Sequence, residues 1–284
     1  MKEIKIFTDS SIDLPGEVLK DLDLSIVSMN INLDNKEYVD LVDIDSDFIL
    51  DYGDKHKKTP KTSCPTFQQV EEILSELGED DYGLFLLISS KSSSSTHLVI
   101  NNVLASKGLE DRVAIIDSKS LSGGLGLLAI KARELVDCGY KFKKVVKLLN
   151  EYTEKISTSF VIDTLDYLYY GGRCSQMTLL FAGSLKIKPM VSLVEGDMKV
   201  VKKYRGNLTK VLSKYVDDMI SNIENIDSKY LVIAHTRIDQ GYLDLVLNKI
   251  KQQEYFENIY VTKASATITS HAGANTVGLF YSFK

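Results

Sequence analysis

Residues 82–104 of the chain are YGLFLLISSKSSSSTHLVINNVL, two apolar runs joined by a stretch rich in serine. The first run is short and nearly continuous, as in β-strands covered on both faces. The second favours a helix that follows the serines and ends near Gly108. Strands that alternate with helices form parallel sheets. This stretch therefore predicts an α/β protein, and the alternation continues on either side of it.

The first half of the chain repeats this pattern up to about residue 155. We expect strands at 4–7, 24–31 and 112–117, a hairpin turn at 34–36, and helices at 66–78, 125–138 and 141–155. The helix at 66–78 opens with a capping box from Thr66 to Gln69 and closes at Gly78. Residues 1–155 are thus predicted to form an N-terminal α/β domain with a doubly wound, mainly parallel sheet.

The pattern changes in the second half. Strands are expected at 158–162, 187–193, 199–204, 230–235 and 258–262, and helices at 207–223 and 239–253. Residues 195–197 form a tight turn between the second and third of these strands. Strands that pair through a tight turn beside two helices predict a mixed sheet. We therefore expect a C-terminal α/β domain over residues 156–284, with the boundary near 156.

Composition excludes several classes of protein. The 284 residues are 44% hydrophobic and 26% charged, which is ordinary for a globular chain. With 39 Asp and Glu against 34 Lys and Arg, the net charge of −5 gives no attraction for a phosphate backbone, so no nucleic acid partner is expected. Cys64, Cys138 and Cys174 lack CxxC spacing and are interpreted as reduced thiols of a cytoplasmic protein.

Neither a membrane segment nor a nucleotide site is expected. The N-terminus has no signal-peptide core, and residues 264–283, although free of acidic and basic side chains, hold too many polar groups for a membrane span. Residues 124–129, GLGLLA, fit G-x-G-x-x-A but do not follow directly from a strand, so tight helix packing or close approach of a ligand is favoured over a dinucleotide. We expect no stable membrane insertion and no cofactor.

Hydroxyl and carboxyl groups follow the expected strands. They gather at residues 8–11, 62–66, 89–96 and 117–118. In open α/β sheets, ligands bind beyond the carboxyl ends of the strands, so these loops predict a donor-lined pocket for a carboxylate or small anion. The alternative for each residue is capping of a helix, and for the serine run a flexible linker.

Three further side chains are candidates for ligand binding. His271 interrupts a charge-free segment, although taken alone a buried core histidine is the favoured interpretation. Arg173 follows Gly171 and Gly172, and Arg205 precedes Gly206. An arginine at such a turn can bind a carboxylate or phosphate with its planar guanidinium, and the alternative is a surface ion pair.

Together these motifs resemble the DegV family of bacterial fatty-acid-binding proteins over nearly the whole chain. The matching segments are Thr8-Asp9-Ser10, Thr62-Ser63-x-Pro65, Ile88-Ser89-Ser90, Asp117-Ser118-Lys119, Gly171-Gly172-Arg173, Ile187-Lys188-Pro189, Arg205-Gly206 and His271-x-Gly273. The chain departs from the family pattern at Ser94-Ser95, where Gly-Thr is usual, and at Ala274-Asn275, where Pro-Gly is usual.

The resemblance implies a two-domain protein that holds one long-chain fatty acid between its domains and is not itself an enzyme. Ser93 and Thr62 would bind the carboxyl group, with His271 acting through Thr62. Arg173 would lie where the charge of an acyl-phosphate appears, so Arg173 and His271 are the expected catalytic residues of the kinase system. Arg205 would dock the ATP-binding subunit of fatty acid kinase, which makes acyl-phosphate for phospholipid synthesis.

Two other classes of function stay open at this point. A serine hydrolase would use Ser93 or Ser63 as nucleophile and His271 as base, although no strained nucleophile turn is present. A small-anion-binding sensor module would need the serine-rich loops but no pocket for an acyl tail. Turnover of an ester would support the first, and extraction of lipid separates the second from a fatty acid carrier.

Overall fold

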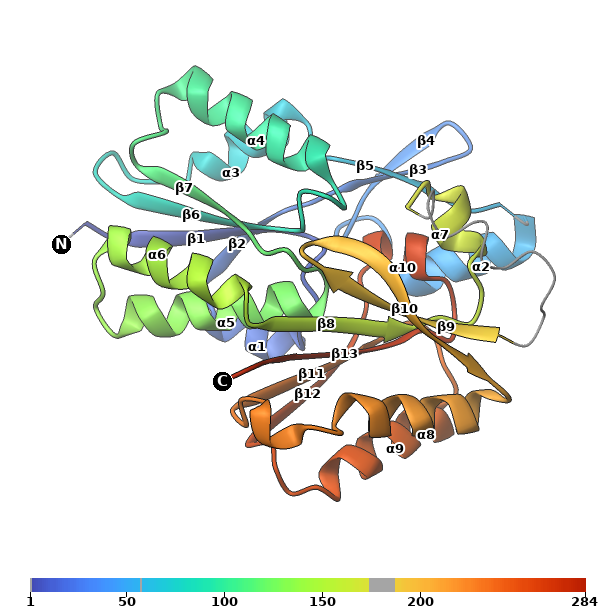
Figure 1. The fold of residues 1–284 in the computed structure, drawn as a ribbon. Helices are drawn as coiled ribbons and strands as arrows, with labels where there is room; N and C mark the ends of the chain where they lie inside the picture. Colours follow the sequence, from blue (N-terminus) through green and yellow to red (C-terminus); the bar gives the residue numbers. More distant parts are fainter. Residues whose placement is uncertain (1, 57, 174–186) are drawn as a thin grey trace.

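The computed structural model describes residues 2–56, 58–173 and 187–284, so Cys174 lies outside the described residues. The protein has a mixed α/β fold (Figure 1). Its first sheet is parallel throughout, in the order β2-β1-β6-β7. The strands are β1 (Ile4–Asp9), β2 (Leu24–Val27), β6 (Tyr82–Leu87) and β7 (Val113–Asp117). The predicted parallel sheet is confirmed.

Helices cover both faces of this sheet (Figure 1). On one face lie α3 (Phe67–Leu74) and α4 (Ser94–Lys107), and on the other α5 (Gly123–Asp137) and α6 (Phe142–Thr153), while α1 (Gly16–Asp21) links β1 to β2. Neighbouring residues of β1 point to opposite faces and are both buried, because Ile6 packs toward α5 and Phe7 toward α3 and α4. The doubly wound arrangement therefore holds.

The second sheet is mixed, in the order β10-β9-β8-β13-β11-β12. Its strands are β8 (Ile156–Val161), β9 (Ile187–Val194), β10 (Asp197–Arg205), β11 (Tyr230–His235), β12 (Asn258–Lys263) and β13 (Val277–Ser282). Only β11 and β12 pair in parallel among these described strands. The outer face is covered by α8 (Leu208–Met219) and α9 (Gln240–Lys251), with a 3-10 turn, η2 (Ile223–Asn225), after α8. The predicted mixed sheet is confirmed, and β13 at its centre was not predicted.

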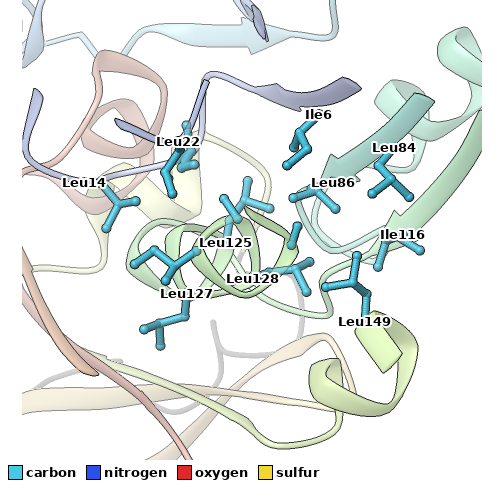
Figure 2. Close-up of a cluster of buried hydrophobic side chains, with 14 of the residues drawn as sticks. Ile6, Leu14, Leu22, Leu84, Leu86, Ile116, Leu125, Leu127, Leu128 and Leu149 are labelled. Atoms are coloured by element: carbon cyan, nitrogen blue, oxygen red, sulfur yellow. The ribbon is translucent and has the colours of Figure 1, made fainter. Parts of the chain in front are cut away.

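Helix α5 lies between the two sheets and contributes to one core with both. Figure 2 shows Leu125, Leu127 and Leu128 of α5 among side chains of the first sheet. A Cβ at Gly126 would lie 2.7 Å from Leu14, and one at Gly123 would lie 2.7 Å from Phe280. Gly126 admits the loop after β1 and Gly123 admits the second sheet, so the glycine pattern serves packing. Because this core joins both halves, the division at residue 156 stays a prediction.

A small antiparallel sheet, β4-β3-β5, completes the first half. It contains β3 (Asn30–Leu33), β4 (Lys36–Val39) and β5 (Lys61–Ser63). The predicted hairpin turn is present, with φ of 44° at Asp34 and 69° at Asn35, as type I′ turns require. The single strand predicted at 24–31 is wrong. The chain leaves the first sheet after Val27 because Met29 bonds through its backbone to Ser10 and Asp40.

Two predicted helix ends also differ from the structure. The capping box at Thr66 is present, but α3 ends at Leu74, before the predicted end at Gly78. The backbone N–H of Ser75 makes the last hydrogen bonds of the helix, to the carbonyl oxygens of Glu71 and Glu72. Helix α8 ends at Met219, short of the predicted end at residue 223, and residues 220–222 form a turn that leads into η2. No helix within the described ranges is both long and apolar enough to cross a membrane.

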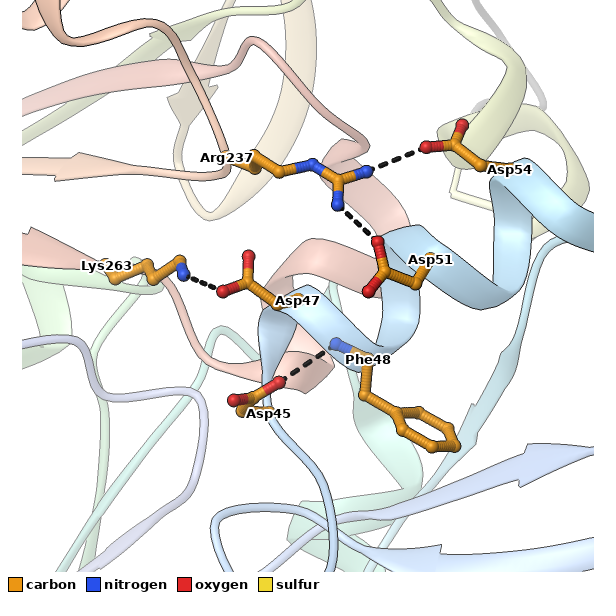
Figure 3. A network of polar contacts seen from close by, with 7 residues as sticks. All are labelled: Asp45, Asp47, Phe48, Asp51, Asp54, Arg237 and Lys263. Carbon is orange, nitrogen blue, oxygen red and sulfur yellow. Dashed lines mark hydrogen bonds and ion pairs between the residues drawn. The ribbon is translucent and has the colours of Figure 1, made fainter.

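Three helices gather beside the small sheet: α2 (Ser46–His56), α7 (Asp166–Tyr170) and α10 (Ala266–Ala272) (Figure 1). Figure 3 shows how α2 is tied to the second half of the chain. Arg237 pairs with Asp51 and, at 2.7 Å, with Asp54, and Lys263 pairs with Asp47. These pairs are exposed and contribute little stability each, but they fix α2 against the loops that follow β11 and β12.

Candidate functional site

A pocket opens between the two halves of the chain, with about 860 Å³ of empty space including the solvent at its mouth. Pockets lined mainly by apolar side chains with a few polar groups are typical of small-molecule sites. Its apolar walls come from both halves: Met29, Ile88, Leu121, Phe160, Leu168, Met198, Ile268 and Phe280. An apolar cavity of this kind favours a ligand with a hydrocarbon part.

Four of the five predicted site residues line this pocket, namely Thr62, Ser93, Arg173 and His271. They come from β5, the start of α4, the turn after α7 and the end of α10. Residues more than 200 positions apart thus meet in one place. Arg205 does not line the pocket and is exposed at the end of β10.

Thr62 and His271 form the polar centre of the site. A hydrogen bond of 2.8 Å joins Thr62 Oγ1 to His271 Nε2. Burial, and then the charge of Arg173, lowers the pKa of His271 to about 3, so the ring is neutral at physiological pH. With its proton on Nε2, the ring donates to Thr62 and leaves the threonine hydroxyl free to donate to a ligand.

Ser93 is placed at the N-terminus of α4 but does not cap that helix. Its Oγ lies 2.9 Å from Thr96 Oγ1 and makes no capping bond to the helix backbone. Thr96 Oγ1 in turn points to Met29 Sδ at 3.5 Å, a weak acceptor. Because sulfur is a weak acceptor, the single Thr96 proton can turn from Met29 to Ser93, and the Ser93 hydroxyl can then donate its own proton into the pocket.

Arg173 brings a positive charge to the pocket. Its Nη1 donates to the carbonyl oxygen of Gly171 at 2.8 Å. Burial lowers the pKa of its guanidinium below the usual value. No carboxylate pairs with Arg173 in the parts of the chain that the structure describes. The surface ion pair considered as an alternative is thus not observed there, and the guanidinium is open to an anionic ligand.

The segment from α7 to Arg173 packs into slots made by glycines. The Tyr167 ring lies against Gly53 of α2 and against Gly273, where an added Cβ would come within 2.7 Å of the ring. Gly171 lies directly against His271 Nδ1, which is buried and has no partner among the described residues. Any side chain at these glycines would displace α7 from the site.

Helix α10, which carries His271, is held by two buried carboxylates of the first half. Asp13 accepts from the Ser265 N–H at 2.8 Å, and Asp40 accepts from the N–H groups of Ala266 and Thr267 at 3.1 and 3.2 Å. Burial raises the pKa of both carboxyls, that of Asp13 to about 7. The first half of the chain therefore positions a helix of the second half.

The other predicted polar loops turn inward and do not line the pocket. Asp9 accepts from the backbone of Ser11 and Ile88, and Asp117 accepts from the Ser90 hydroxyl at 2.5 Å. Ser89 donates to the Gly196 carbonyl at 2.6 Å and links the serine loop to the β9–β10 turn. These residues bond within the protein without capping a helix, and among the predicted loops only residues 62–64 and 92–95 bring hydroxyl groups to the pocket.

The arrangement disfavours a serine hydrolase. His271 Nε2 bonds to Thr62, while Ser93 contacts Thr96 and Ser63 accepts from Asn32 at 3.3 Å. A ring with a pKa near 3 is also a weak general base at neutral pH. Neither predicted nucleophile thus has the histidine contact that this chemistry needs.

Comparisons with known proteins agree with this geometry. The model of the DegV family, described as an uncharacterised protein family, matches residues 3–284. A DegV domain-containing protein of Clostridium perfringens is 29% identical over 99% of both chains. A DegV family protein of Thermus thermophilus, described as fatty-acid-binding, is similar in structure with a TM-score of 0.88 and 25% identity, covering 99% of this chain and 100% of that one.

A further solved structure is similar in fold. It is the Fatty Acid Kinase (Fak) B3 protein of Streptococcus pneumoniae loaded with linoleic acid, with a TM-score of 0.83 and 21% identity. The alignment covers 99% of this chain and 100% of that one. At this identity the likeness establishes the shared fold alone.

Proposed function

This chain belongs to the DegV family, and from that premise we propose that it binds one long-chain fatty acid with the tail buried between its two halves. The observation that carries the proposal is the pocket itself, in which apolar walls meet Thr62, Ser93, His271 and Arg173. The fatty-acid-binding DegV protein of Thermus thermophilus, which covers nearly the same length, supports it.

The tail supplies most of the binding free energy. Burial of a methylene group is worth about 0.8 kcal/mol, so a tail of about 14–18 carbons contributes roughly 10 kcal/mol. Loss of translational and rotational freedom offsets several kcal/mol of this. Tight binding follows from the apolar walls alone, and a lipid acquired in the cell is expected to stay bound during purification.

The head group decides which lipid is accepted. A carboxylate removed from water without partners carries a large penalty. The hydroxyls of Thr62 and Ser93 offset it, and the positive charge of Arg173 in the same pocket favours the ionised acid. Since His271 is neutral, it orients the Thr62 hydroxyl without adding a second charge.

We further propose that the bound acid is presented to the ATP-binding subunit of a fatty acid kinase, which forms the acyl-phosphate. The Fak B3 protein, similar in fold, supports this assignment. Arg173 is suited to stabilise the charge that appears on phosphoryl transfer. Arg205, exposed at the end of β10, is suited to dock the partner. The chain itself then acts as carrier, with no cofactor of its own.

Thermal unfolding of the delipidated protein tests the binding proposal. Hexadecanoate is expected to raise Tm at micromolar concentration, whereas acetate and octanoate raise it little, because binding stabilises in proportion to affinity and affinity grows with tail length. An equal effect of acetate and hexadecanoate would instead support the small-anion module.

A further inference from the structure

Ser92 differs from its neighbours in the serine-rich loop. Ser92 lines the pocket beside Ser93, and its Oγ is buried with no hydrogen-bond partner in the described ranges of the chain. The backbone N–H groups of Ser92 and Ser93 both bond to the Ser89 carbonyl, at 2.9 and 3.0 Å. The loop backbone is thus fixed, while the hydroxyl binds no other described residue.

Neighbouring serines use their hydroxyls within the protein. Ser89 donates to the Gly196 carbonyl, and Ser90 donates to Asp117. Ser93 bonds to Thr96, and Ser94 is exposed and does not line the pocket. The run of serines therefore contains structural, solvent-facing and pocket-lining members, and Ser92 lines the pocket with no partner for its hydroxyl among the described residues.

A buried hydroxyl without a partner costs free energy that an alanine at the same place would avoid. A serine side chain turns about a single bond between staggered rotamers, so the Ser92 hydroxyl can reach the space that its residue lines. The cost is recovered if a ligand atom in the pocket accepts the proton. A carboxylate offers about four acceptor sites on two oxygens, more than Thr62 and Ser93 occupy.

We propose that Ser92 is a third hydroxyl donor to the carboxylate of the ligand, beside Thr62 and Ser93. This inference rests on the proposed fatty acid binding and specifies its head group as an ionised acid. A hydroxyl that serves a charged oxygen makes a stronger bond than one that serves a neutral group. Ser92 therefore favours a free acid over the corresponding alcohol.

Delipidated parent, Ser92→Ala, Ser90→Ala and Ser94→Ala proteins test the proposal. Each is unfolded thermally without ligand and titrated with hexadecanoate and hexadecanol. For Ser92→Ala we expect an unchanged or higher Tm without ligand, about tenfold weaker binding of hexadecanoate, and a smaller loss for hexadecanol. Ser94→Ala should match the parent, and Ser90→Ala should lower Tm because Asp117 loses its donor.

Two results would overturn the inference. Ser92→Ala could bind hexadecanoate as the parent does, or it could lower the ligand-free Tm as Ser90→Ala does, which would show that the hydroxyl serves the protein. Failure of the parent itself to bind hexadecanoate is a distinct result, because it would overturn the proposed function and the role of Ser92 together.

Discussion

His271 acts in the site as a neutral ring. Burial and the Arg173 charge lower its pKa to about 3 from an ordinary value near 6.5. The unfolded chain therefore binds a proton between these values that the folded protein does not. The contribution of His271 to stability is fully present above pH 6.5 and falls as the pH drops toward 3. Within the physiological range, the bond to Thr62 does not depend on titration.

Substitution of Arg173 is expected to reduce phosphoryl transfer far more than fatty acid binding. Arg173→Ala should still bind hexadecanoate, about tenfold more weakly than the parent, because the tail supplies most of the binding free energy and one charged contact adds only part of the rest. With the ATP-binding subunit present, formation of acyl-phosphate should fall by about 100-fold or more, since the developing charge loses its guanidinium. The rate is measured by single-turnover assay on lipid-loaded protein. A rate like that of the parent would refute the role.

At the residue scale, the sequence predicted the polar centre but not its surroundings. Residue type and position indicated only that these side chains are well placed, and the roles of Thr62, Ser93, Arg173 and His271 came from the resemblance to the DegV family. Ser92 could not be distinguished, since its missing partner is a property of the folded loop. The Tyr167 slot depends on Gly53 and Gly273, which lie far apart in the sequence.

Helix α10 shows why some elements were not predicted. Its sequence, ATITSHA, is rich in β-branched and hydroxyl residues, which are weak helix formers. It is helical because Ser265, Asp13 and Asp40 accept from its first N–H groups. A capping carboxylate supplied from more than 200 residues away leaves no local signal. The charge-free segment that follows, β13, showed burial in the sequence but not its strand.

The pH dependence of the stability of an Asp13 variant tests the role of Asp13 in holding α10. Burial raises the pKa of Asp13 to about 7 from 3.8, so its contribution to stability is fully present below about pH 4 and is lost as the pH rises through 7. Asp13→Asn removes this dependence. From pH 5 to pH 8, the variant should gain about 2–3 kcal/mol relative to the parent.

Tm values of delipidated parent and variant at both pH values measure this effect. The titration of His271 is common to both proteins and cancels, while that of Asp40 cancels apart from its charge interaction with Asp13. An identical difference in Tm at pH 5 and pH 8 would show that Asp13 titrates normally.

The position of helix α7 is expected to depend on Gly273, against which the Tyr167 ring packs. Gly273→Ala adds a Cβ 2.7 Å from the Tyr167 ring at a φ of 70°, so it should destabilise the protein by about 2–4 kcal/mol. It should also weaken hexadecanoate binding, because Leu168 and Arg173 follow the displaced Tyr167. Gly139→Ala is the matched control, since its φ is 74° with no atom within 4 Å. Equal affinity of the two variants for hexadecanoate would contradict the proposal that packing of Tyr167 against Gly273 positions the site.

On the scale of the whole molecule, the site exists because two sheets share α5. Alternating strands and helices predicted the parallel sheet, and the tight turn at 195–197 predicted part of the mixed one. The shared position of α5 was not predicted, because a helix that begins with a continuous apolar, glycine-containing run is compatible with several packings. The pocket opens beside this helix and takes its walls from both halves of the chain.

Arg205 lies on the outer surface and is expected to affect docking of the ATP-binding subunit but not fatty acid binding. Arg205→Ala should bind hexadecanoate as the parent does, because Arg205 is exposed and does not line the pocket. Its affinity for the ATP-binding subunit should fall by about tenfold or more, as for a charged contact at an interface. Binding measured by surface plasmon resonance at two salt concentrations checks this. Equal affinity of variant and parent for the ATP-binding subunit would show that Arg205 does not contribute to docking.

Native mass spectrometry of the protein purified from cells tests the central claim most directly. We expect a folded species whose mass exceeds that of the chain by one fatty acid of about 14–18 carbons, and the extra mass should appear in a solvent extract as a free acid. A bare chain without a stoichiometric acyl species, found in repeated preparations and unchanged after incubation with hexadecanoate, would contradict the account.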